Sequence, residues 1–265
     1  MASRQAWDAL VQRLYAKGVD IFDAADPPLT DAGPRDPKVV ALTLLARTLR
    51  TAQAADRLLQ DDFVVEARTL TRTILENLFF SAALSKKGEA FVAELELDDI
   101  TVRRKRAKGL LEFFEKQGES AEQHARLKAY REELWERHGK TAEIKMVEAA
   151  LVGGVSDAFI AYRELSTDAA HPSAASLSLH IVTNEDPGEA PFSVTASPVL
   201  DLTEPADTLE LLCMAVLGVI VAVDEVLGGV GVGEPLSVLA RDYAALSASN
   251  KVDRDGGEDP TPSKA

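Results

Sequence analysis

The stretch LLCMAVLGVIVAV, residues 211–223, decides the fold of this chain of 265 residues. The run is shorter than the ~20 apolar residues that a membrane-spanning helix needs. Acidic residues flank it at Glu210, Asp224 and Glu225. A helix that is apolar on all sides is typical of a protein core. We therefore expect residues 204–227, capped by Thr203, to form the central and most buried helix of a helical protein.

The overall composition agrees with a helical, cytoplasmic protein. Hydrophobic residues make up 46% of the chain but aromatic residues only 6%, which favours helix packing over a β-sandwich. The only cysteine, Cys213, excludes an internal disulfide and fits a reducing compartment. A net charge of −14 disfavours nucleic-acid binding except through a local basic patch. The N-terminus reads as an amphipathic helix without the apolar centre of a signal peptide, so no membrane segment is expected.

Helix start and stop signals divide the chain into three parts. Residues 1–35 form an N-terminal helix and a Pro-rich loop, residues 36–247 form a single helical domain, and residues 248–265 form a disordered tail. The expected helix starts are Asp36-Pro37, Asp61 or Asp62, Asp98 or Asp99, and a capping box of Ser120 with Gln123. The helices are expected at 4–17, 37–59, 62–85, 99–116, 121–139, 142–152, 155–170, 204–227 and 235–249, with a break at Gly153-Gly154.

A short segment interrupts this helical pattern. SLSLHIVT, residues 176–183, alternates polar and apolar residues, and FSVTA, residues 192–196, reads as a return strand after the turn residues NEDPGEAP. The fold class is therefore all-α, a mainly helical bundle, with one inserted β-hairpin near 176–197. The glycine run GGVGVG, residues 228–233, reads as a helix C-cap and loop because it lacks the Gly-Lys-Ser/Thr of a phosphate loop.

The early helix contains EARTLTRTILENLFF, residues 66–80, with Arg72 between apolar neighbours. Glu76 lies one turn later at i+4, and Arg68 lies one turn earlier on the same side. Two interpretations stay open. Arg72 and Glu76 form a partly buried ion pair that fixes the helix, or they belong to a functional site.

A second cluster lies in AYRELSTDAAHPS, residues 161–173. Tyr162 and Ser166 share one helix face, and Arg163 borders it. His171 precedes a proline and therefore lies at or beyond the end of the helix, where the helix dipole favours its charged form. The side chains could converge on a catalytic cleft, or Tyr162 and Ser166 could anchor the core while His171 caps the helix.

The third cluster is TVRRKRAKG, residues 101–109, the densest basic segment of an acidic chain. Its cations could contact RNA phosphates, or they could form a solvated helix face paired with nearby acids. The residues concerned are Arg103, Arg104, Lys105, Arg106 and Lys108.

The motif R-x3-E, followed by Y-R-x2-S-x4-H-P, resembles a bacterial family catalogued as a domain of unknown function, and through it the HEPN-like proteins. The resemblance covers residues 40–225 and matches Arg72, Glu76, Tyr162, Ser166 and His171. It implies an all-helical fold, self-association, and a metal-independent RNase of a toxin–antitoxin or phage-defence system, with RNA or an antitoxin as partner. Arg163 and His171 would then bind and protonate the phosphodiester, although seven residues separate them, a longer spacer than HEPN RNases have.

Other chemistries have little support in the sequence. The four histidines and single cysteine lack the spacing of metal ligands, so neither metal nor cofactor is expected. Two hypotheses therefore remain. The protein is a HEPN-like RNase that uses Arg163, His171, Ser166 and Tyr162, or it is a non-catalytic binding or scaffold protein in which these residues, with Arg68, Arg72 and Glu76, are structural.

Overall fold

The computed structural model describes residues 3–27, 30–117, 121–139, 142–168, 172–184 and 190–255. This part of the chain holds ten α-helices, one short 3-10 helix and one two-stranded antiparallel sheet, so the predicted fold class is confirmed. The elements are α1 (Arg4–Ala24), η1 (Gly33–Arg35), α2 (Pro37–Gln60), α3 (Val64–Lys87), α4 (Glu89–Gln117), α5 (Ala121–His138), α6 (Met146–Gly153), α7 (Ala158–Asp168), α8 (Ala174–Ser178), β1 (Ile181–Thr183), β2 (Phe192–Val194), α9 (Glu204–Leu227) and α10 (Leu236–Asp255).

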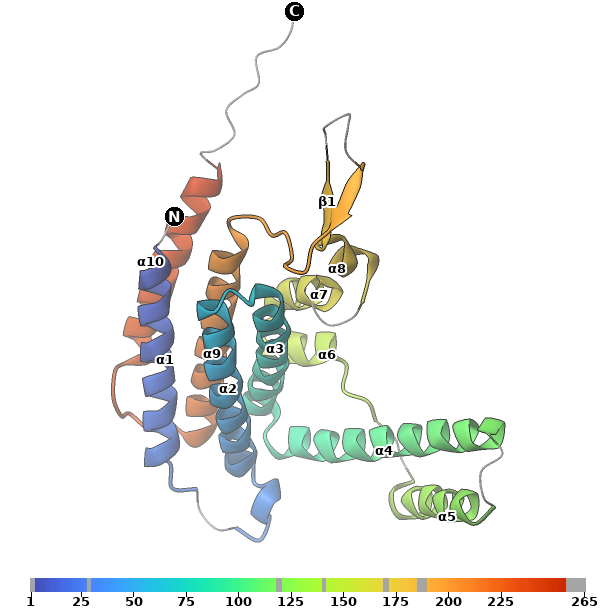
Figure 1. Cartoon of the computed structure of the whole chain (residues 1–265). Coiled ribbons are helices and arrows are strands. Elements are labelled where there is room, and N and C mark those ends of the chain that lie inside the picture. The colour runs from blue at the N-terminus through green and yellow to red at the C-terminus, as the bar shows by residue number, and fades with distance from the viewer. Residues whose placement is uncertain are drawn as a thin grey trace, which may run out of the picture.

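The core lies between α1, α2, α3 and α9, which run side by side, with α10 packed along α1 and α9 (Figure 1). Trp7 and Leu10 of α1 join the same core as Leu212 and Ile220 of α9, so the N-terminal helix shares one core with the rest of the bundle. By length and hydropathy α9 could span a membrane, but 61% of its most apolar window is buried inside the protein.

The prediction that α9 is the most buried element is wrong by a small margin. Both α9 and α3 have 24 residues, and α3 buries twelve of them against eleven for α9. The reason is that α3 is covered on several sides by α2, α6, α7 and α9. Even Asn77, which the helical period places on its polar face, is buried and donates to Thr48 Oγ1 of α2 over 3.0 Å.

Several predicted boundaries agree with the structure because local chemistry sets them. The Asp36 carboxylate accepts the Lys38 backbone N–H at the start of α2, as an N-cap does. Gly154, at φ 71°, ends α6, and Gly228, at φ 89°, ends α9. Both glycines adopt the left-handed conformation that side chains with a Cβ avoid.

Other predicted helix starts are wrong. Phe63, not Asp61 or Asp62, precedes α3, and Asp62 instead takes the left-handed conformation that closes the turn after α2. Asp98 and Asp99 lie inside α4, which already begins at Glu89, directly after Gly88 at φ 55°. The capping box expected at Ser120 lies outside the described residues.

The predicted hairpin is present but shorter. Residues 181–183 pair with 192–194, with Val182 opposite Ser193. The start of the alternating segment folds as α8 instead, because Ser173 forms a capping box with Ser176. At the ends of the chain, α1 runs on to Ala24 and α10 to Asp255, past the point where a tail was expected to begin; residues 256–265 lie outside the described part.

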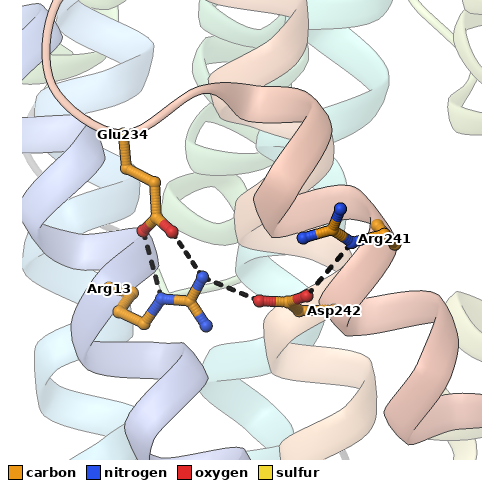
Figure 2. Close-up of polar contacts among 4 residues, drawn as sticks. All are labelled: Arg13, Glu234, Arg241 and Asp242. Atoms are coloured by element: carbon orange, nitrogen blue, oxygen red, sulfur yellow. Dashed lines mark hydrogen bonds and ion pairs between the residues drawn. The ribbon is translucent and has the colours of Figure 1, made fainter.

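Two features extend from the bundle or fasten its edge. Helix α4 leaves the bundle crosswise and α5 folds back along it, which gives an arm formed by α4 and α5 (Figure 1). On the opposite side, Arg13 of α1 donates to Glu234, in the loop before α10, and over 2.8 Å to Asp242 of α10 (Figure 2). Asp242 also lies 3.6 Å from Arg241 of its own helix, and the contact from Arg13 to Asp242 ties the C-terminal helix to the N-terminal one.

Candidate functional site

Arg72, on α3, is the centre of a polar cluster between α3 and α7. Its Nε donates to Ser166 Oγ over 2.7 Å, its Nη2 donates to the Tyr162 hydroxyl over 2.8 Å, and its Nη1 lies 3.1 Å from Glu76 Oε1. The ion pair with Glu76 is the one that the i,i+4 spacing predicts. We call Arg72, Glu76, Tyr162 and Ser166 the Arg72 cluster.

The hydrogen bonds of the Arg72 cluster close on themselves. The Tyr162 hydroxyl accepts from Arg72 and donates to Glu76 Oε1 over 3.2 Å. The Ser166 hydroxyl accepts from Arg72 and donates to the Tyr162 backbone carbonyl over 2.7 Å. Each hydroxyl therefore uses its proton inside the fold, and the Ser166 proton goes to a backbone carbonyl rather than to a general base.

Aromatic packing encloses one side of the Arg72 cluster. The guanidinium carbon of Arg72 lies 4.7 Å from the centre of the Tyr162 ring, within the range of a cation–π contact. That ring stacks on Phe159 and meets the edge of the buried Phe79. Burial, and secondarily the charge of Glu76, raises the pKa of the Tyr162 hydroxyl, so the phenol stays protonated and suits a hydrogen-bond donor.

Arg68 lies one turn before Arg72 but takes a different partner. Its Nη1 lies 2.8 Å from Glu204, at the N-terminus of α9, where the helix dipole also favours a carboxylate. The pair is largely buried, with 13% and 25% of the two side chains exposed. It borders a cavity of about 230 Å³ lined also by Val65, Ala175, Ser178 and Leu179, so Arg68 links α3 to α9 rather than joining the Arg72 cluster.

Of the residues assigned to catalysis, the three that the structure describes lie on two different sides of α7. Tyr162 and Ser166 point to Arg72, whereas Arg163 is exposed on another side of α7. His171 lies outside the described residues. Arg72 with its three partners is therefore partly buried, and the exposed Arg163 does not belong to the Arg72 cluster.

The basic segment of α4 is largely paired with acids. Arg103 lies 2.9 Å from Asp99, Lys105 pairs with Glu143, and Lys108 lies 3.7 Å from Glu112. Arg106 is exposed. Arg104 is only 8% exposed and packs its guanidinium against the Trp135 ring of α5. The contacts of Arg103, Lys105 and Lys108 agree with a solvated helix face with acidic partners, whereas Arg104 is buried and does not belong to that face.

Sequence reasoning missed a polar pocket between α1, α2 and α9. Asp56 is 5% exposed there, and its Oδ2 accepts amide N–H groups from Gln12 and Gln60. Asp56 and Gln60 are one helical turn apart, which sequence could have indicated, but Gln12 comes from a different helix.

The described residues offer no group of three or more His, Cys, Asp or Glu side chains that could hold a metal ion. Cys213, the one thiol, is buried in α9, and burial raises its pKa well above the ordinary range. A thiol in that state is a poor nucleophile.

Comparison with known protein families identifies the family to which the chain belongs. Residues 38–189 match the family described as "Family of unknown function (DUF5677)", which covers more than half of the chain. The chain belongs to this family. The match includes the whole Arg72 cluster and the arm. No curated protein and no solved structure shows a significant match to the chain.

Proposed function

We propose that this DUF5677 protein is a non-catalytic binding protein in which the Arg72 cluster is structural. The observation that carries the proposal is that all three guanidinium nitrogens of Arg72 contact partners within the fold, Glu76, Tyr162 and Ser166. An arginine that stabilises a transition state needs N–H groups aimed at the substrate. Arg72 instead joins α7 to α3, and this fixes the surface that α7 carries.

That surface carries several exposed apolar side chains. Large hydrophobic side chains are exposed along α6, α7, α8, the hairpin and the segment between β2 and α9; the most exposed are Leu151, Ile160, Leu177, Phe192, Val194, Val199 and Leu202. Among the described residues the sheet has only two strands, and all six of their residues are exposed. A two-stranded sheet is marginally stable alone, and exposed apolar patches mark interaction sites.

The partner that we propose for this surface is a second copy of the chain. A strand edge can pair with the same edge of another copy about a two-fold axis, which buries the apolar side chains of both. The HEPN-like resemblance also implies self-association.

The test compares two exposed phenylalanines. Phe192, on β2, and Phe113, on α4, are 58% and 55% exposed, so replacing each with Asp changes a similar surface. In light scattering at micromolar concentration we expect wild type and Phe113→Asp to be dimers and Phe192→Asp to be a monomer. A monomeric wild type, or a dimer that survives Phe192→Asp, would contradict the proposal.

Metal-independent RNA cleavage, in a toxin–antitoxin or phage-defence setting, is the second candidate. The observation that favours it is the exposed Arg163, which could reach a phosphate, on the helix that leads into the segment with His171. The net charge of −14 and the paired basic segment of α4 count against RNA binding. If the binding proposal holds, wild type leaves RNA intact in EDTA. Cleavage that disappears in folded Arg163→Ala and His171→Ala variants would establish the RNase instead.

A further inference from the structure

A cavity of about 240 Å³ lies between α1, α2 and α9, on the part of the bundle where these helices run side by side (Figure 1). Its walls combine two kinds of side chain. Gln12, Gln53, Asp56 and Gln60 are polar, whereas the apolar wall consists of Val11, Leu14, Leu49, Ala52, Leu212 and Val216. The exposed Arg57 and Gln60 belong to its rim.

Asp56 is the group in this cavity whose bonding is incomplete. Its Oδ2 accepts from Gln12 over 3.0 Å and from Gln60 over 3.1 Å. Its Oδ1 is buried and has no hydrogen-bond partner among the described residues. A buried carboxylate that has only neutral amide donors lacks the counter-charge that buried acids normally have.

The surroundings of Asp56 disfavour its ionised form. Burial raises the pKa of the carboxyl, and the nearby Asp8 raises it further, while Arg4 and the two glutamines act in the opposite direction. A cation bound in the cavity would reverse this balance. Such a ligand would place a cation in direct contact with Asp56, whose only hydrogen-bond donors among the described residues are two neutral amides, while Arg4 acts on it without a hydrogen bond.

We infer that this cavity binds a small organic ammonium ion with an apolar body. The N⁺–H groups would donate to the Asp56 carboxylate, in the charge-assisted type of hydrogen bond that is strongest in a dry site. The Asp56 Oδ1, which has no hydrogen-bond partner among the described residues, is the oxygen that would accept them. The apolar body would lie on Leu49, Ala52 and Leu212, beside Tyr15.

The size and lining limit the ligand further. A cavity of roughly 150 Å³ holds benzene, so the observed volume suits a phenyl or cyclohexyl group with a short amine chain. A metal ion does not fit, because Gln12 and Gln60 turn their N–H groups, not their amide oxygens, toward Asp56, which leaves a single carboxylate as ligand. Cys213 also lines the cavity, but its raised thiol pKa makes covalent capture of the ligand unfavourable. The inference is independent of the proposed dimer, which uses α7 and the hairpin.

The test uses 2-phenylethylamine and its uncharged analogue of the same shape, 2-phenylethanol. Thermal shift and titration calorimetry on the full chain should show saturable binding of the amine and at least about tenfold weaker binding of the alcohol. Asp56→Asn, which keeps the size of the side chain, should weaken binding of the amine by about tenfold or more. Asp23→Asn, an exposed acid on α1, should bind as wild type does.

A second variant keeps the test decisive if Asp56→Asn does not fold. Ala52→Leu fills the cavity and leaves the carboxylate in place, so it should also abolish amine binding. The inference is overturned if the amine does not bind wild type, if the alcohol binds equally well, or if the amine binds Asp56→Asn unchanged. Equal binding of amine and alcohol would mean an apolar cavity with no role for the charge.

Discussion

Two arginines of this protein stack on aromatic rings at the same distance, yet their surroundings differ. Arg72 lies 4.7 Å from the centre of the Tyr162 ring in the bundle, and Arg104 lies 4.7 Å from the centre of the Trp135 ring in the arm. Tyr162 is packed between Phe79 and Phe159 and belongs to a cluster with a carboxylate. Trp135 is 59% exposed. A cation–π distance therefore does not by itself show how much a contact stabilises a fold.

The difference lies in what each contact connects. The Arg72 cluster joins two helices that both pack on the core, so breaking it exposes buried groups in the cooperative bundle. Arg104 joins α4 to α5, and α5 packs mainly on α4. The arm can consequently open while the bundle stays folded, as regions with few long-range contacts do.

Among the predicted changes in stability, the largest loss should follow Arg72→Ala. The change removes donors from Tyr162 and Ser166 and leaves Glu76 partly buried without its counter-ion. Because the two side chains of the ion pair remain 22% and 27% exposed, we expect a loss below that of a fully buried pair, about 2–3 kcal/mol of the free energy of unfolding. Urea denaturation measures it. Arg103→Ala, which breaks an exposed pair on α4, is the control and should leave the midpoint unchanged. Equal midpoints for both variants would refute the structural role of Arg72.

Two glycine substitutions should change stability in opposite directions. A Cβ on Gly153 of α6 would lie 2.5 Å from the Ala82 side chain and 3.0 Å from its backbone carbon, so Gly153→Ala should cost about 1–3 kcal/mol. A Cβ on Gly109 of α4 meets nothing within 4 Å, so Gly109→Ala should gain up to about 1 kcal/mol of helix stability. Thermal unfolding by circular dichroism compares them. A stabilising Gly153→Ala would mean that α6 does not approach α3 so closely.

Much of the bundle could be predicted because its signals are local. The apolar run of α9, the Asp36 cap and the i,i+4 spacing of Arg72 and Glu76 all depend on residues close in sequence. The serine capping box at 173–176 is local too, and it outweighs the strand-like alternation that begins at residue 176.

What could not be predicted depends on partners from distant segments. Helical periodicity places Asn77 on a polar, solvent-facing side of α3. Its burial becomes understandable only when Thr48 of α2 is known to accept its hydrogen bond. The position of Arg104 under Trp135 depends on how α5 folds back on α4. The Asp56 pocket needs Gln12 from α1. Helical periodicity gives the direction of a side chain around its own axis but not the neighbour that it meets.

Charged groups inside the bundle and at its edge should respond to pH in opposite ways. Hydrogen bonds from Arg13 lower the pKa values of Glu234 and Asp242, so their contribution to stability is present above the unfolded pKa and disappears as pH falls through the folded one. Burial raises the pKa of Asp56, so its contribution is present below the unfolded pKa and disappears as pH rises through the folded one. Urea midpoints at pH 7 and pH 3.5 should show that Arg13→Ala loses more stability at pH 7. The urea midpoint of Asp56→Asn relative to that of wild type should be higher at pH 7 than at pH 3.5. The opposite pH dependence in either variant would refute the direction of the pKa shift assigned to that group.

The smallest effect on the bundle should follow Arg104→Ala, although Arg104 is more buried than Arg72. The two tryptophans of the chain allow unfolding of the bundle and of the arm to be followed separately, because Trp7 is fully buried in the core and Trp135 lies on the arm. In a Trp135→Phe background the fluorescence of Trp7 follows the bundle alone, and its urea midpoint should not change when Arg104 is replaced. In the native background, hydrogen exchange should show faster amide exchange in α5 and unchanged protection in α3 and α9. A shift of the Trp7 midpoint as large as that of Arg72→Ala would mean that arm and bundle unfold as one unit. The position of α5 on α4 would then depend on the same cooperative core that the Arg72 cluster holds together.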